Sequence, residues 1–204
     1  MGLVAAFVLS ALSLVGAIWL SAQCACEMRS AEAQAIDALK QVVAAEKTWY
    51  ASDVDGNGIQ DYWTGDVAAL YGAIGPDGQP ARLVDLEVAR MDAQAAERHR
   101  SVGHGNAWFG YVMTPLVRDS RGMSYQEDLD RDGLAEECSF GFAFVAYPER
   151  RRASFHPHLR HRLSTDGQLL IDERGLPKRL DMGDGAPAQQ WPEEPERWAW
   201  LYQE

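Results

Sequence analysis

Acidic side chains at alternate positions are the residues in this sequence whose spacing could do chemistry. An EF-type calcium loop takes oxygen ligands from positions 1, 3, 5, 7 and 9, with a glycine at position 6 and a bidentate glutamate at position 12. The stretch DVDGNGIQDYW, residues 53–63, follows this spacing up to position 9. The predicted calcium ligands are Asp53, Asp55, Asn57, Ile59 through its backbone carbonyl, and Asp61. Position 12 is Thr64, so water, Asp66 or a neighbouring segment has to complete the shell.

A second acidic loop, EDLDRDGLAEE, repeats the pattern in weaker form. Its candidate calcium ligands are Asp128, Asp130, Asp132 and Glu136, with Gly133 at the turn and Ser139 at position 12. Asp, Asn and Gly also favour turns, so we expect the first loop mainly to end a helix and to bind calcium as a secondary property, while the second can be a hairpin connector. Both interpretations stay open, and any calcium affinity belongs to the weak extracellular class, about 10⁻⁴ to 10⁻³ M.

Other chemistry finds little support in the sequence. It contains no GxSxG, HExxH, Walker loop or dinucleotide fingerprint, and we therefore expect no enzymatic activity. Its three cysteines form no CxxC pair, which disfavours zinc and redox sites. The net charge of −11 disfavours nucleic acid as a partner, because phosphate backbones select basic surfaces.

An apolar segment precedes the first acidic loop. Leu3 to Ala25 contains no charged residue, and at 1.5 Å per residue a helix of this length can cross a hydrocarbon core of about 30 Å. We predict a transmembrane anchor over residues 1–26, in contact with membrane lipid. Residues 27–204 then form a globular domain that faces the periplasm or the exterior from the inner membrane. A cleaved signal peptide, a buried helix or lipid attachment at Cys24 are the alternatives.

Between the anchor and the first acidic loop, the pattern is that of an amphipathic helix. Ile36, Leu39, Val43 and Tyr50 recur on one helical face, and the absence of Pro and Gly from Ala17 to Asp55 predicts a helix that runs unbroken from the membrane to the loop. A further helical pattern covers residues 82–100.

Strand-like segments follow at residues 108–117 and 139–147, and a hairpin is predicted to turn at residues 165–167. The segment 139–147 is apolar on both faces, which is typical of a central strand. The sequence thus predicts an α+β fold, in which a long N-terminal helix packs on a small antiparallel β-sheet.

This layout resembles that of type IV pilins and pseudopilins. In particular, AIDALKQVVAAEKTWYASDVDGNGIQDYW, GYVMTPL and FGFAFVAYPERRRASFHPHLRHRLSTDGQLLIDERG resemble poorly characterised bacterial envelope proteins of planctomycete type, over residues 33–175. The tripeptide AYP, residues 146–148, is the most specific of these motifs. The resemblance implies a pilin-like domain with a structural or assembly role in a type II secretion or type IV pilus system, and other pilin-like subunits as partners.

The chain departs from the pilin pattern near its N-terminus. Pilins carry Glu as the fifth mature residue, and counting from Leu3 that position is Phe7. This departure fits a minor or non-assembling relative better than a major pilin. The alternative is an anchored periplasmic or extracellular binding module outside any filament.

Overall fold

The computed structural model describes residues 31–93, 102, 110–148, 168–180, 187–192 and 198–200. The chain divides between Gln34 and Ala35 into two compact units. Residues 31–34, the first turn of a helix, belong to the first unit, and all other described residues belong to the second. The predicted anchor, residues 1–26, lies outside the described residues. Among the helices of the described part, none is long and apolar enough to cross a membrane.

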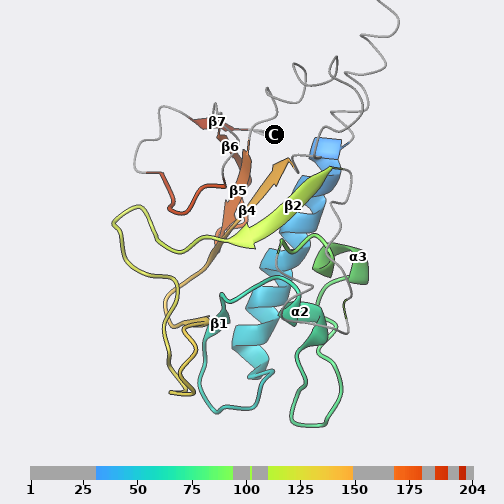
Figure 1. The fold of residues 1–204 in the computed structure, drawn as a ribbon, viewed down its shortest axis with the longest axis vertical. Helices are drawn as coiled ribbons and strands as arrows, with labels where there is room; N and C mark the ends of the chain where they lie inside the picture. Colours follow the sequence, from blue (N-terminus) through green and yellow to red (C-terminus); the bar gives the residue numbers. More distant parts are fainter. Residues whose placement is uncertain are drawn as a thin grey trace, which may run out of the picture. The chain divides into compact units, whose positions relative to one another are not determined.

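The first described element is a helix over residues 31–52, drawn in blue to cyan in Figure 1. Its buried positions recur with helical spacing: Ala35, Ile36, Ala38, Leu39, Val42, Val43, Ala45 and Trp49. The predicted apolar face is confirmed at Ile36, Leu39 and Val43, whereas Tyr50 is half-buried and stacks on Tyr62 with ring centroids 4.7 Å apart. The helix ends as predicted at the first acidic loop, where Asp53 takes the left-handed φ of 47°.

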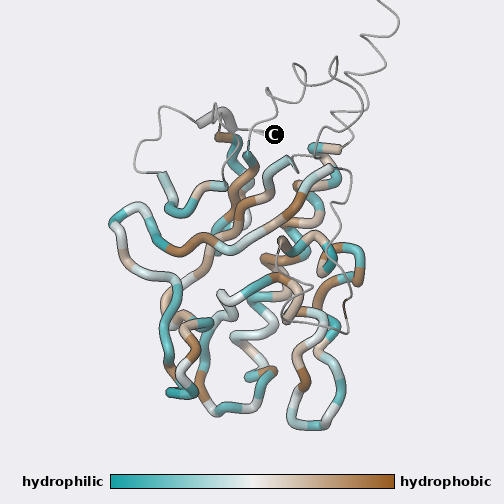
Figure 2. Tube along the Cα trace, viewed as in Figure 1, coloured by the Kyte–Doolittle hydropathy of each residue, from teal (hydrophilic) through white to brown (hydrophobic). Residues whose placement is uncertain are grey.

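Of the two sheets in the described part of the chain, the larger is antiparallel, with the strand order β2-β4-β5-β6-β7. Its strands are β2 (Tyr111–Pro115), β4 (Ala143–Pro148), β5 (Gln168–Asp172), β6 (Lys178–Leu180) and β7 (Trp198–Trp200). β4 pairs with β2 on one side and β5 on the other, which confirms the predicted interior strand. Figure 2 shows hydrophobic residues gathering along the strands of this sheet and hydrophilic ones along the loops.

A smaller sheet joins two segments that lie far apart in the sequence. β1 (Tyr62–Trp63) pairs antiparallel with β3 (Glu137–Cys138), with Tyr62 opposite Cys138 and Trp63 opposite Glu137. The first acidic loop leads into β1 and the second leads into β3, so this pairing brings the two loops together. The sequence did not predict it.

Several predicted elements are shorter than expected. Within the predicted helix over residues 82–100, the described part contains only α3 (Leu86–Ala89), while another short helix, α2 (Ala69–Gly72), precedes it. The predicted strand over residues 139–147 begins only at Ala143, because residues 139–142 connect β3 to β4. Phe140, which falls within the predicted strand, is 39% exposed. The predicted turn at residues 165–167 lies outside the described residues.

Candidate functional site

The first acidic loop folds through a series of tight turns. Asp53, Gly56 and Gly58 all have positive φ values, of 47°, 73° and 80°. The Asp53 carboxylate accepts the Gly58 N–H at 3.2 Å, and the Asn57 Oδ1 accepts the Ile59 N–H at 2.7 Å. These bonds are what Asp and Asn contribute to turns, and they confirm that the loop terminates the helix.

Three carboxylates converge beside this loop. Oxygens of Asp55, Asp61 and Glu137 lie within 4.8 Å of one another. The Asn57 Nδ2 donates to all three, at 3.0 Å to Asp55, 3.5 Å to Asp61 and 3.2 Å to Glu137. Asp61 and Glu137 are only 1% and 4% exposed. We refer to Asp55, Asn57, Asp61 and Glu137 as the acidic site.

Glu137 reaches the acidic site because β3 pairs with β1. Its Oε1 accepts from Asn57, while its Oε2 accepts the backbone N–H groups of Leu129 and Asp130, both at 3.2 Å. One carboxylate therefore connects the first acidic loop to the second. It adds a carboxylate to the first loop, whose own sequence has Thr64 in place of the last one.

Burial and mutual repulsion raise the pKa values of the acidic site. Desolvation, with the charges of Asp55 and Asp53 added, raises the pKa of Asp61 to about 6, although the hydrogen bond from Asn57 acts in the opposite direction. Desolvation and the charge of Asp61 raise the pKa of Glu137 to about 7. A cation between these carboxylates would favour their ionised form, and carboxylate and amide oxygens are ligands that calcium takes.

The other predicted ligands of the first loop have different partners. Asp53 accepts from Gly58, and Ile59 donates its N–H to Asn57. Thr64, at position 12, donates its hydroxyl to the Tyr125 carbonyl at 2.6 Å. Asp66 accepts the Ala69 N–H at 2.7 Å, ahead of α2.

The second acidic loop forms a more exposed cluster. Oxygens of Asp128, Asp130 and Asp132 lie within 4.8 Å of one another, and all three residues are exposed. Asp130 and Asp132 each accept a backbone N–H two residues along, as turn residues do. The side chain of Glu136, the fourth predicted ligand, instead lies close to Gly65. Three of the four candidates are thus brought together.

Sequence reasoning missed Glu137 as a member of the site. A loop pattern of 12 residues cannot include a side chain from a strand far along the chain. The available signal was the acidic pair Glu136–Glu137 directly before a strand-like run, where one of two adjacent side chains must face inward.

The long helix contributes another buried acid near this site. Glu46 is 0% exposed, and the backbone of Trp63 is its nearest hydrogen-bonding group, in a geometry too poor for a full hydrogen bond. Desolvation raises the pKa of Glu46 well above its ordinary value, and the charges of Asp61 and Asp66 add to the effect. Because burial disfavours a charge more than the Trp63 backbone favours it, the position favours the neutral, protonated carboxyl.

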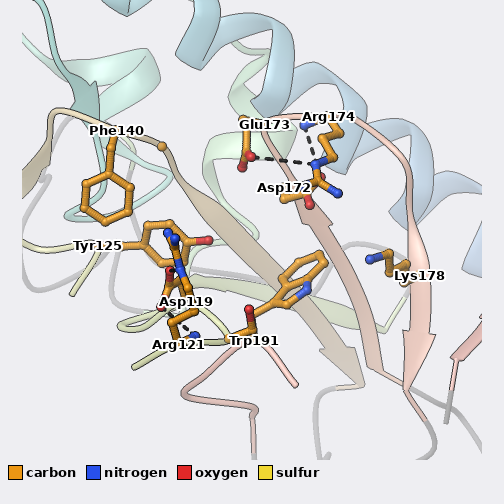
Figure 3. A pocket seen from close by; sticks show the side chains of 11 residues that line it. Asp119, Arg121, Tyr125, Phe140, Asp172, Glu173, Arg174, Lys178 and Trp191 are labelled. Atoms are coloured by element: carbon orange, nitrogen blue, oxygen red, sulfur yellow. Dashed lines mark hydrogen bonds and ion pairs between the residues drawn. The ribbon is translucent and has the colours of Figure 1, made fainter. Parts of the chain in front are cut away.

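A separate pocket of about 430 Å³ lies between the loop after β2, the β3–β4 connection and the β5–β6 turn (Figure 3). Its charged and aromatic lining residues are Asp119, Arg121, Tyr125, Phe140, Asp172, Glu173, Arg174, Lys178 and Trp191. It shares no residue with the acidic site.

No protein-family model, curated protein or solved structure matches the chain.

Proposed function

We propose that this chain is a membrane-anchored envelope protein with a structural or assembly role, similar to minor pilins and pseudopilins. One observation carries the proposal. The helix over residues 31–52 follows the uncharged segment Leu3 to Ala25 and buries an apolar face in an α+β domain with an antiparallel sheet. That layout is the one the resemblance to pilins implies. The domain would face the periplasm or the exterior, and its role would be non-catalytic.

Cell fractionation tests the anchor. We expect the full chain in the membrane fraction, resistant to an alkaline wash, because an apolar segment of this length is costly to expose to water. A chain beginning at Ser30 should appear in the soluble fraction. A soluble full-length chain with an intact N-terminus would reject the anchor and, with it, the pilin analogy.

Cross-linking of intact cells distinguishes a pilin-like subunit that assembles with other copies from an anchored binding module outside any filament. A ladder of homo-multimers that requires the N-terminal segment supports a pilin-like subunit. A full chain that stays monomeric in the membrane would favour the anchored binding module.

We also propose that the acidic site binds calcium as a structural cation. The support is the combination of loop spacing and a distant carboxylate. Asp55, Asn57 and Asp61 occupy ligand positions 3, 5 and 9, and Glu137 adds a third carboxylate to Asp55 and Asp61, which could supply the bidentate ligand. Water and backbone carbonyls would complete the six to eight oxygens that calcium takes. Asp128, Asp130 and Asp132 form a weaker candidate, since their exposure leaves the carboxylates well hydrated.

Thermal melting of the full chain in a non-ionic detergent, with calcium or with chelator, tests this site. For a Kd of about 10⁻⁴ to 10⁻³ M, calcium at about 10 mM adds roughly 1.4 to 2.7 kcal/mol of stability, or about 3 to 10 °C in Tm. Glu137→Gln should abolish the shift. The matched control is Glu136→Gln, one residue away but directed at Gly65, and it should keep the shift. If calcium raised the Tm of Glu137→Gln and Glu136→Gln equally, the calcium would bind somewhere other than the acidic site.

A substitution at Asn57 distinguishes a cation site from a hydrogen-bonded turn. To ligate calcium, Asn57 has to present its Oδ1 where its Nδ2 now donates to three carboxylates. Asn57→Asp removes that donor and adds a negative charge. The variant should melt lower than wild type in chelator and regain stability in calcium, with a larger calcium shift than wild type. A variant that is equally destabilised in both conditions would show that the loop is a turn only.

A further inference from the structure

The pocket in Figure 3 has an acidic wall at the end of β5. Asp172 is buried and accepts the Arg174 N–H at 3.0 Å, which fixes the turn that follows. The carboxylate of Glu173 forms a long ion pair with the Arg174 Nε, at 3.9 Å and beyond hydrogen-bond distance, and the Arg174 side chain is 74% exposed. Glu173 therefore keeps the capacity to accept hydrogen bonds from a ligand.

A basic group is fixed on the opposite side, in the loop after β2. The Arg121 Nε donates to the Asp119 Oδ2 at 3.0 Å, and the Arg121 backbone N–H donates to the other oxygen at 2.8 Å. The Nε bond fixes one edge of the guanidinium and leaves the edge with the two terminal nitrogens open. The terminal Nη groups have no partner among the described residues, and the side chain is 73% exposed. A guanidinium presented in this way matches a carboxylate with two parallel hydrogen bonds.

An aromatic surface lies between the two charged walls. The rings of Tyr125 and Phe140 stack with centroids 5.8 Å apart, and Phe140 is 39% exposed. Between Phe140 and β4, Gly141 contributes no side chain and leaves this part of the pocket open. A methyl group there would meet the Glu173 Oε2 at 3.5 Å and the Tyr125 Cε1 at 3.8 Å, so these side chains border the same space.

From these three surfaces we propose that the pocket binds a small zwitterion, an amino acid or short peptide with a free ammonium and a free carboxylate. The ammonium lies at Glu173, the carboxylate at Arg121, and an apolar side chain against Phe140. The lining carries three acidic and three basic side chains, which cancel, so a ligand with both charges fits better than one with a single net charge. The volume of about 430 Å³ falls within the range of small-molecule sites. This binding activity goes beyond a structural role and does not depend on the acidic site.

Calorimetric titration of the full chain in a non-ionic detergent tests the proposal. The probe is the dipeptide phenylalanylglycine with both ends free, compared with its N-acetylated and C-amidated forms. The free dipeptide should bind saturably, and each cap should weaken binding about tenfold, because it removes one charged hydrogen-bonding group. Free phenylalanine, titrated in parallel, distinguishes an amino acid from a peptide as the preferred length. Absence of saturable binding at millimolar dipeptide would overturn the proposal.

Two variants assign the two ends of the ligand. Glu173→Gln should weaken the free dipeptide and lose the penalty for N-acetylation, while it keeps the penalty for C-amidation. Arg121→Gln should give the reverse pattern. Both side chains are at the surface, so folding should be unaffected, and Glu87→Gln, an exposed acid on α3, is the matched control. Variants that weaken all three dipeptides equally would refute the assigned orientation and the zwitterion with it.

Discussion

Glu46 illustrates how one residue can make stability depend on pH. Its pKa in the folded protein is raised well above 4.5, chiefly by burial, so the folded state holds a proton that the unfolded state releases more easily. Stability from this group is therefore fully present below the unfolded pKa and is lost as the pH rises through the folded pKa. Because glutamine cannot ionise, Glu46→Gln should lose less stability than wild type as the pH rises.

The measurement is Tm against pH for wild type and Glu46→Gln, in chelator. The two proteins should melt alike near pH 4, and the variant should melt higher near pH 9. Asp37→Asn, an exposed acid on the same helix, is the control and should follow wild type throughout. Parallel curves for wild type and Glu46→Gln would mean that Glu46 does not titrate within this range.

The position of Glu46 was contained in the sequence, although its role was not. The apolar series Ile36, Leu39, Val43 and Tyr50 has a gap of seven residues, and Glu46 falls within it on the same face. Periodicity can therefore place this acid on the buried side of the helix. It cannot show whether the side chain finds a partner there, because partners come from tertiary contacts.

At the scale of elements, the first acidic loop packs against the loop over residues 73–80. A Cβ on Gly56 would clash with the Pro76 Cγ, whereas nothing lies within 4 Å of the corresponding atom on Gly58. Both glycines have positive φ, so alanine at either position carries a similar backbone strain of about 1–2 kcal/mol. Gly56→Ala should cost a further 1–3 kcal/mol or so, because it forces the two loops apart.

Chemical denaturation gives the free energy of unfolding of Gly56→Ala and Gly58→Ala. Because the backbone strain is common to both variants, the difference between them reports the contact between Gly56 and Pro76. Measurement in chelator keeps the contribution of calcium out of the comparison. Equal losses of unfolding free energy would show that the loop contact contributes nothing to stability.

Elements with a strong local pattern were predictable, and elements defined by pairing were not. The helix over residues 31–52 and the interior strand β4 follow from periodicity and from apolar character on both faces. β1 and β3 contain two residues each, too few to leave a periodic signal, and they exist because they pair with each other. The spacing in the sequence therefore predicted three residues of the acidic site, Asp55, Asn57 and Asp61, but not Glu137.

At the scale of the molecule, an excess of negative charge is distributed unevenly. The net charge is −11, yet the pocket lining is balanced, with Arg121, Arg174 and Lys178 facing three acids. Two clusters of carboxylates lie instead in the acidic loops that the pairing of β1 with β3 brings together. Composition alone predicts an acidic surface that repels nucleic acid. It does not show which carboxylates lie close enough together to bind a cation.

The pairing of β1 with β3 also sets an order of events for the folding chain. Asn57 and Glu137 are 80 residues apart, and closing a loop of that length costs roughly 4 kcal/mol of chain entropy. An unfolded chain, or a fragment that ends before Glu137, contains the loop pattern without the site. A cation that takes ligands from both residues would therefore bind only after these two parts of the chain have met.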